Sequence, residues 1–281
     1  MARYRLDIVY DGTPFSGWQR QDGVPSVQQA IEEAIEAFAG PTQDGLVRLH
    51  AAGRTDAGVH AEGQVAHVDL TRDWEAGVVR RATNANLLRA RQPVAIRAAS
   101  RVDGAFHARF SATARHYRYL ILDRDWPPTT GRHTVWWVPT AEPLDVARMG
   151  EAAGRLMGRH DFTTFRAAHC QADSPVRTLD RLDAVREGEG IVVRASARSF
   201  LHHQVRSMVG ALKRVGEGRW SPDDVAAALD ARERARCPGM APAAGLCLTR
   251  VDYAAGPGTA GTGGASEGPS EGAASTTAGR A

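Results

Sequence analysis

Hydrophobic and polar residues alternate at the start of the chain and then change to a helical spacing. The segment Tyr4 to Tyr10 is apolar at every second position, which predicts a half-buried strand. The polar run from Asp11 to Pro25, rich in glycine and proline, predicts a long loop, and long loops in compact domains often carry function. Ser26 and Gln29 have the spacing of a capping box. Apolar residues then recur at helical spacing until Gly40, which predicts one helix.

Similar patterns continue to about residue 253 and predict a protein of mixed α and β structure. We expect strands at Leu46–Ala51, Gln64–Leu70, Val94–Val102, Ala112–Leu122, Leu179–Arg186 and Ile191–Ala197. We expect further helices at Ala76–Asn86, Leu144–Met157 and His202–Val215. Strands and a helix recur in a similar order in both parts of the chain. We therefore predict an α+β fold of two pseudo-duplicated halves, each an antiparallel sheet with helices on one face, with a catalytic cleft between them.

The sequence divides into three parts. Residues 1–105 form the expected N-terminal half and residues 106–253 the C-terminal half. Residues 254–281 consist mainly of Gly, Ala, Ser, Thr and Pro, which cannot bury enough apolar surface to offset chain entropy, so we predict a disordered tail. Within it, residues 256–261 match a dinucleotide-binding pattern and residues 264–268 a hydrolase nucleophile pattern. We interpret both as chance matches, because neither follows a strand.

The segment Gly53-Arg54-Thr55-Asp56-Ala57-Gly58-Val59-His60 lies between two expected strands and combines one carboxylate with an arginine and two glycines. Glycine lets the backbone turn sharply and approach a ligand, while Arg54 places a permanent cation close to Asp56, a possible nucleophile. A short loop with these residues more often only forms a turn or caps a helix. A catalytic interpretation therefore depends on the rest of the sequence.

The overall composition, with 43% hydrophobic and 24% charged residues, is typical of a soluble globular protein. Since no apolar run reaches the length of a secretory signal or a membrane span, we expect a cytoplasmic protein without a membrane partner. The three cysteines, Cys170, Cys237 and Cys247, are far apart and lack a Cys-x-x-Cys pair. This spacing argues against a disulfide framework and against a structural zinc site.

Basic residues suggest a nucleic-acid partner. The formal net charge is +3 and the isoelectric point about 9.0, with Lys213 as the sole lysine. An arginine excess alone is also what a GC-rich genome produces. Clustering is more informative, because arginines interleaved with aromatic residues are typical of surfaces that follow phosphates and stack bases. These clusters contain Arg101, Arg109, Arg115 and Arg118, and Arg194, Arg198 and Arg206, among Phe106, Phe110, Tyr117, Tyr119 and Phe200. We therefore expect an RNA or DNA partner.

Four further segments accompany the loop around Asp56: Gly17-Trp18-Gln19-Arg20-Gln21, Phe106 to Ala114, Tyr117, and Phe200 to Gly210. Together with the loop, which reads GRTDAGVH and is followed by GQVAH, they closely resemble the bacterial tRNA pseudouridine synthase A family from about Tyr4 to Tyr253. The resemblance implies that uridine is isomerised to pseudouridine at nucleotides 38, 39 and 40 of the tRNA anticodon stem-loop, without cofactor or metal. It also implies a homodimer that binds tRNA through the anticodon arm.

The resemblance assigns Asp56 as the catalytic aspartate. The reaction breaks the C1′–N1 glycosidic bond, rotates the uracil and joins C5 to C1′. Whether Asp56 attacks C1′, adds to the base or removes a ribose proton stays open, but each route requires an ionised carboxylate, which burial disfavours unless a cation is close. Arg206 matches the family position of such a cation. The alternative is that Arg206 contacts a phosphate or is a solvated helix charge.

Three more residues match substrate-binding positions of the family. Tyr117 matches a tyrosine whose ring can stack on the uracil, and Arg54 matches a residue that occupies the space left by a flipped-out base. Leu246 matches an apolar position that lines the uracil pocket. Core packing is the alternative for Tyr117 and Leu246. The histidines of these regions show no metal-ligand spacing, so we expect packing and RNA contact: His60, His67, His202 and His203.

Two other classes of protein compete with this interpretation. A catalytically silent RNA-binding module would use the same basic residues for structural or chaperone work. A hydrolase would use Asp56 as an aspartyl nucleophile, but the chain has no paired Asp-x-Asp motif beside the loop and no Asp-Thr-Gly signature.

Overall fold

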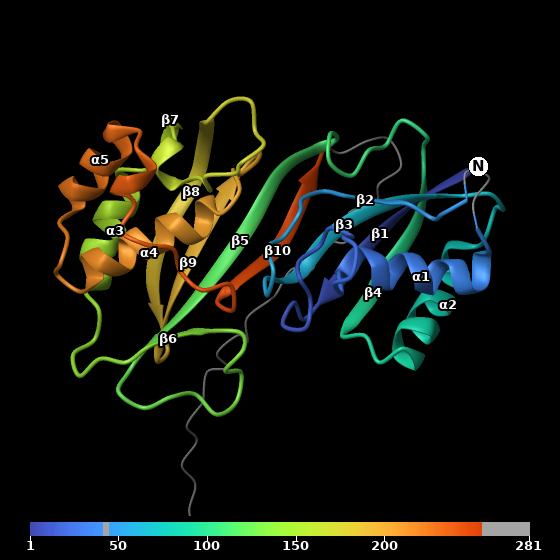
Figure 1. The fold of residues 1–281 in the computed structure, drawn as a ribbon, viewed down its shortest axis with the longest axis horizontal. Helices are drawn as coiled ribbons and strands as arrows, with labels where there is room; N and C mark the ends of the chain where they lie inside the picture. Colours follow the sequence, from blue (N-terminus) through green and yellow to red (C-terminus); the bar gives the residue numbers. More distant parts are fainter. Residues whose placement is uncertain (42–44, 255–281) are drawn as a thin grey trace, which may run out of the picture.

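The computed structural model describes residues 1–41 and 45–254, and within them ten strands form one sheet (Figure 1). The strands are β1 (Ala2–Tyr10), β2 (Leu49–Ala51), β3 (His60–Leu70), β4 (Val94–Val102), β5 (Ala112–Asp123), β6 (Trp136–Val138), β7 (Gly158–Asp161), β8 (Val176–Glu187), β9 (Gly190–Ala197) and β10 (Leu246–Tyr253). The α-helices are α1 (Val27–Ala39), α2 (Ala76–Arg89), α3 (Val146–Gly154), α4 (Gln204–Gly216) and α5 (Pro222–Ala231). Two short 3₁₀ turns lie at Thr163–Phe165 and Arg234–Arg236. The tail predicted to be disordered lies, beyond residue 254, outside the described residues.

The sheet is continuous through both parts of the chain, in the order β4-β1-β3-β10-β5-β9-β8-β7, with β2 paired to β3 and β6 to β5. Figure 1 shows β10, the last strand, between β5 and β3. Its pairing with β5 is antiparallel, whereas its pairing with β3 is parallel and short, with Cys247 opposite His60 and Leu248 opposite Ala61. The two predicted antiparallel sheets are therefore joined into one large mixed sheet, and the mixed α+β class is confirmed. Alternation identifies a strand but not its partner, and β10 pairs with strands remote from it in sequence.

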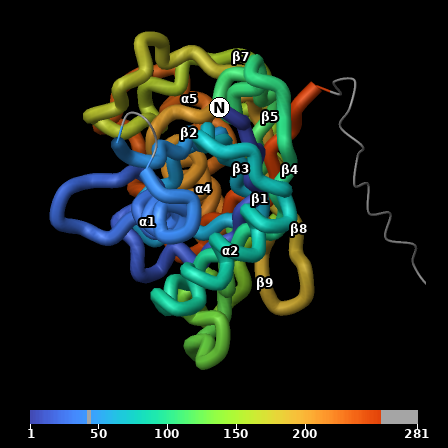
Figure 2. Tube along the Cα trace, turned by 90° about the vertical axis from the view of Figure 1, so that its right-hand side faces the viewer, coloured from blue at the N-terminus to red at the C-terminus, as the bar shows by residue number. Residues whose placement is uncertain are grey.

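Two hydrophobic cores lie under the helices. The first packs β1, β3 and β4 against α1 and α2, and the second packs β5, β8 and β9 against α3, α4 and α5. These helix groups occupy the right and the left of Figure 1, and Figure 2 shows α1 and α4 on the same side of the strands. Ala108, Ala112 and Leu248 pack in the first core although they follow residue 105. Division of the chain at residue 105 stays a prediction.

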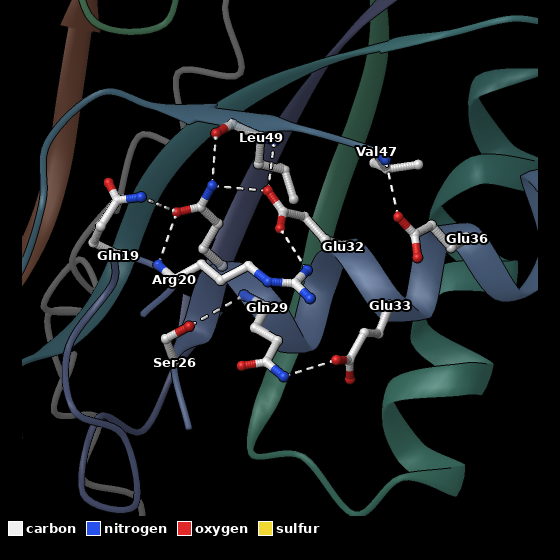
Figure 3. Close-up of polar contacts among 10 residues, drawn as sticks. Gln19, Arg20, Ser26, Gln29, Glu32, Glu33, Glu36, Val47 and Leu49 are labelled. Atoms are coloured by element: carbon white, nitrogen blue, oxygen red, sulfur yellow. Dashed lines mark hydrogen bonds and ion pairs between the residues drawn. The ribbon is translucent and has the colours of Figure 1, made fainter. Parts of the chain in front are cut away.

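The N-terminal elements form for the reasons seen in the sequence. In β1 the side chains of Tyr4, Leu6 and Ile8 are fully buried, and the intervening residues are only partly so. Ser26 caps α1 by accepting a hydrogen bond from the backbone N–H of Gln29 at 3.3 Å. The side chain of Gln29 donates to Glu33 at 2.8 Å, so only half of the predicted capping box forms (Figure 3).

A buried polar network fastens α1 to the segments that lead to Asp56 (Figure 3). The carboxylate of Glu32, 3% exposed, accepts hydrogen bonds from the backbone N–H of Leu49 at 2.9 Å and from the side chain of Gln28 at 2.8 Å. The amide oxygen of Gln28 accepts from the backbone N–H of Arg20 at 3.0 Å. Buried polar groups are stable only when paired in this way. The helix thereby fixes both the loop of residues 11–25 and the start of β2.

Several elements differ from the prediction. Strand β2 is shorter than expected and β3 begins four residues earlier, at His60. Strands β6, β7 and β10 and helix α5 were not predicted. Helix α5 carries a recognisable signal, because Ser221 and Asp224 form a capping box and Pro222 opens the helix. Within the residues described, no helix is both long and apolar enough to cross a membrane.

Candidate active site

Asp56 lies in the loop between β2 and β3, and the loop of residues 11–25 holds it in place. The carbonyl of Thr55 accepts a hydrogen bond from the backbone N–H of Trp18 at 3.0 Å, and the Thr55 hydroxyl pairs with the Tyr10 hydroxyl at 2.8 Å. The backbone N–H of Gly58 donates to the carbonyl of Phe15 at 3.3 Å. The expected long loop is thus part of the support for Asp56.

The two loops approach so closely that one position requires glycine. A Cβ atom built on Gly12 would lie 2.1 Å from the carbonyl oxygen of Val59, a distance that backbone atoms cannot tolerate. The root of the Asp56 loop is fixed separately, because the side chain of Gln64 donates to the carbonyl of Gly53 at 2.7 Å. Ala52 belongs to the first core and Val59 to the second, so the loop crosses from one core to the other. Asp56 lies at this junction.

Three basic side chains surround the carboxylate of Asp56, which is 17% exposed. Nη1 of Arg206 lies 2.8 Å from Oδ2, Nε2 of His202 lies 3.3 Å from Oδ1, and Nε2 of His203 lies 3.5 Å from Oδ2. The Arg206 side chain is only 11% exposed, so its charge acts on the carboxylate with little solvent screening. Burial lowers the pKa of His203 despite the opposing effect of Asp56, and the ring is neutral at neutral pH. The arginine is therefore the permanent cation of the site.

Helix α4 carries Arg206, and a second close backbone approach fixes its guanidinium. A Cβ on Gly210 would lie 2.3 Å from the carbonyl oxygen of Gly239, so the segment around Gly239 packs directly on the helix. In that segment the carbonyl of Ala241 accepts from Nε of Arg206 at 2.9 Å, and the N–H of Ala241 donates to the carbonyl of Arg206 at 3.0 Å. One edge of the guanidinium is held by backbone while the other pairs with Asp56.

Tyr117 on β5 lies beside the Asp56 loop and packs against both cores. Its ring meets the ring of Phe200 edge to face, with centroids 5.3 Å apart, and its hydroxyl lies 4.0 Å from where a Cβ on Gly53 would stand. Burial, with a further contribution from the Asp56 carboxylate, raises the pKa of Tyr117 above its ordinary value. The phenol keeps its proton at neutral pH and can donate a hydrogen bond.

The other two predicted residues have different surroundings. Arg54 is exposed and makes no hydrogen bond or ion pair with residues 1–41 or 45–254, so its guanidinium is free to meet a partner molecule. Leu246 is 5% exposed, belongs to the second core and pairs with Tyr119 of β5. The structure thus brings Asp56, Arg206 and Tyr117 together, leaves Arg54 at the surface, and places Leu246 in the core.

Arg115 has a role that the sequence did not reveal. We expected it to belong to a cluster facing nucleic acid, but it is 7% exposed and donates to backbone carbonyls inside the protein. Its Nη2 donates to Ala52 and to Arg109, both at 2.7 Å, and its Nη1 donates to the carbonyl of Arg198. These acceptors lie before the Asp56 loop, in the loop preceding β5, and after β9. One side chain therefore ties together three segments around the site.

Replacing Arg115 with methionine is expected to lower the free energy of unfolding by about 3 kcal/mol, because several buried carbonyls lose their donor. Thermal unfolding followed by circular dichroism measures this change. Arg101→Met is the matched control: Arg101 is 59% exposed and pairs with Asp73 at the surface, so its loss should cost less than about 1 kcal/mol. Equal stability of the two variants would contradict the role given to Arg115.

The structure shows a relation of His202 and His203 to Asp56 that the sequence spacing did not reveal. Sequence spacing gave them no second or third ligand, yet the fold brings both rings to Asp56, about 150 residues earlier in the chain, and the ligand atoms of the three residues lie within 4.8 Å of one another. Among the residues that the structure describes, Asp56, His202 and His203 are the one group of His, Cys, Asp or Glu side chains close enough together to hold a metal ion. A surface cavity of about 450 Å³ lies elsewhere, against Met1, Arg3 and Asp69, and shares no residue with this cluster.

Comparison with known proteins defines the class to which this fold and site belong. The chain matches the family described as tRNA pseudouridine synthase over residues 8–111 and 152–254, more than half of its length. The chain therefore belongs to the tRNA pseudouridine synthase family, a family of isomerases. The two matched segments are consistent with two pseudo-duplicated halves.

The similar proteins carry a more particular name. The chain is 60% identical to the tRNA pseudouridine synthase A of Mesorhizobium japonicum over 253 residues, which cover 90% of this chain and 100% of the relative. It is 58% identical to the tRNA pseudouridine synthase A of Paramagnetospirillum magneticum, over 93% of this chain and 99% of the relative. The protein of that name from Rhizobium meliloti is 55% identical over 90% of this chain and 100% of its own length. These relatives confirm the resemblance predicted from the sequence motifs.

Proposed function

We propose that this protein isomerises uridine to pseudouridine at nucleotides 38, 39 and 40 of the tRNA anticodon stem-loop, with Asp56 as the catalytic residue. The observation that carries the proposal is the pairing of the Asp56 carboxylate with Arg206 at 2.8 Å, at the junction of the two cores and beside Tyr117. An ionised carboxylate is what each of the three routes open to this chemistry requires. Arg206 stabilises that form in a largely buried site.

The residues near Asp56 are suited to hold the uracil and to stabilise the stem from which it leaves. The uracil must be held while its bond to C1′ breaks and it rotates, and the ring of Tyr117 offers an aromatic face and a hydroxyl beside Asp56. A uridine in a paired stem must first leave the stack, at a cost of a few kcal/mol. The guanidinium of Arg54, which pairs with none of the residues that the structure describes, is suited to take the space that the base leaves. Leu246 contributes an apolar wall, with core packing as its second role.

Transfer RNA is the partner that this site and the surface residues fit. Arg198 is exposed, and Arg109 is exposed with its guanidinium 5.6 Å from the ring centre of Phe110, itself 71% exposed. Such cation and aromatic pairs bind phosphates and stack on bases. We further infer a cytoplasmic homodimer that acts without cofactor or metal, as the family resemblance implies.

A tritium-release assay tests the function directly. Uridines labelled with tritium at C5 lose the label to water when C5 bonds to C1′, because the proton on C5 must leave. We expect release from a tRNA transcript without added metal or nucleotide, and no release when cytidine replaces the uridines at nucleotides 38, 39 and 40. Undiminished release from the cytidine-substituted transcript would refute the proposed positions. A requirement for an added nucleotide would refute the cofactor-free reaction.

A further inference from the structure

The carboxylate of Asp56 and the two imidazoles of His202 and His203 form a cluster whose geometry is that of a metal site. In a tetrahedral zinc site with metal–ligand distances of about 2.0 to 2.1 Å, neighbouring ligand atoms lie about 3.3 Å apart. Here Nε2 of His202 lies 3.3 Å from Oδ1 of Asp56, and the ligand atoms of all three residues lie within 4.8 Å of one another. The two rings are adjacent, with centroids 3.9 Å apart. Small side-chain rotations would direct all three ligand atoms at one ion.

The backbone that carries the two histidines is fixed before any ion binds. His203 has a left-handed conformation with φ of 65°, and the side chain of Gln204 accepts a hydrogen bond from the backbone N–H of Leu201 at 2.8 Å. The carbonyl of His202 accepts from the N–H of Ala167 at 2.9 Å. Within the described part of the chain, neither imidazole has a polar partner other than Asp56. Both ring nitrogens nearest the carboxylate are therefore available as ligands.

The ligand atoms of the site decide which ion fits, and its charge decides how tightly the ion binds. Arg206 occupies Oδ2 of Asp56 and leaves Oδ1, the oxygen nearest His202, for an ion. Two imidazoles and one carboxylate oxygen suit zinc, cobalt, nickel or copper, whereas magnesium prefers an all-oxygen set. The positive guanidinium weakens binding, so we expect affinity on the order of micromolar rather than that of a structural zinc site.

We propose that Asp56, His202 and His203 bind zinc or a similar borderline-soft divalent ion, and that the bound ion inhibits the enzyme. The ion engages the carboxylate that the reaction needs and adds positive charge beside it. Three protein ligands leave a fourth position for water. The inhibition rests on the proposed function of Asp56, whereas the binding of the ion does not.

Two direct measurements test metal binding on the full chain freed of metal by dialysis against a chelator. Isothermal titration calorimetry measures zinc binding, and the visible absorption of added cobalt reports tetrahedral ligation by nitrogen and oxygen. We expect one ion per chain. His202→Ala removes a ring that is 48% exposed, and His203→Asn keeps a residue that tolerates the left-handed backbone, so both variants should fold. Each should bind zinc at least tenfold more weakly.

His169→Ala is the matched control, because His169 is an exposed histidine next to Cys170 and outside the cluster at Asp56. Its zinc affinity should equal that of the unmodified chain. Absence of zinc binding in the unmodified chain would overturn the proposal. Full affinity in both His202→Ala and His203→Asn, or loss of affinity only in His169→Ala, would also overturn it.

The tritium-release assay then tests inhibition. Micromolar zinc should stop release, a chelator should restore it, and millimolar magnesium should have no such effect. Zinc bound through His202 and His203 without any loss of release would overturn the inhibitory half of the proposal. Zinc binding by a chain that releases no tritium under any condition would instead refute the proposed function and leave the metal site standing.

Discussion

Replacing Asp56 with asparagine is expected to lower the rate of pseudouridine formation at least about 10³-fold, because the substitution keeps the shape of the side chain and removes its charge and basicity. Binding of tRNA should change by less than about threefold, since phosphate contacts supply most of the affinity. Tritium release measures the rate, and a filter-binding titration at fixed salt measures the affinity. A loss of rate without a loss of affinity identifies an enzyme. A silent RNA-binding module would release no tritium even with Asp56 present, and its affinity for tRNA would not change with Asp56→Asn.

Asp223→Asn on α5 provides the control for this substitution. Asp223 is 82% exposed and pairs with Arg155 at 2.9 Å, and neither residue is one of those that the structure brings to Asp56. The rate of pseudouridine formation by Asp223→Asn should stay within about twofold of the rate of the unmodified protein, since an exposed ion pair contributes little to the stability of the fold. Turnover by Asp56→Asn above a tenth of the normal rate would remove Asp56 from the chemistry.

Replacing Arg206 with lysine is expected to lower kcat about 10²- to 10³-fold with KM nearly unchanged, the range seen when one preorganised electrostatic partner is lost. Lysine keeps the charge but has a single nitrogen. Its ammonium group lacks the planar fork with which Nε of Arg206 bonds the Ala241 carbonyl while Nη1 pairs with the Asp56 carboxylate. Steady-state kinetics with a tRNA transcript measure both constants.

Arg214→Lys on the same helix tests whether the position or merely the residue type matters. Arg214 lies 3.9 Å from Glu217, and its side chain is 35% exposed. We expect a kcat within about twofold of that of the unmodified protein, since a surface ion pair of this kind contributes little to the stability of the fold. If Arg206→Lys instead raises KM and leaves kcat unchanged, Arg206 is a phosphate contact, the alternative that the sequence leaves open.

Local elements of the fold could be predicted because their signals are local. The alternation in β1 and the Ser26 cap of α1 identify these elements from a few neighbouring residues. The joining of the two expected sheets could not be predicted, because β10 pairs with β3 over only two residue pairs and across most of the chain. Sequence patterns describe which face of a strand is buried, and the partner strand is set by tertiary packing.

The site shows the same limit. Asp56, Tyr117 and Arg206 were found because a resemblance over much of the chain pointed to them, and each lies in a segment with a specific motif. Arg115 was misinterpreted because its neighbours in sequence are basic and aromatic, while its hydrogen-bond partners Ala52 and Arg198 lie more than 60 residues away. His202 and His203 could be related to Asp56 only in three dimensions.

The position of β10 also has a consequence during synthesis of the protein. Strand β10 leaves the ribosome after all the other strands, yet it fills the gap between β3 and β5. Until then the facing edges of these two strands carry unpaired backbone groups, which invite association with other chains. The nascent protein should therefore need protection from aggregation, by a chaperone or by rapid release, until residues 246–253 emerge and close the gap.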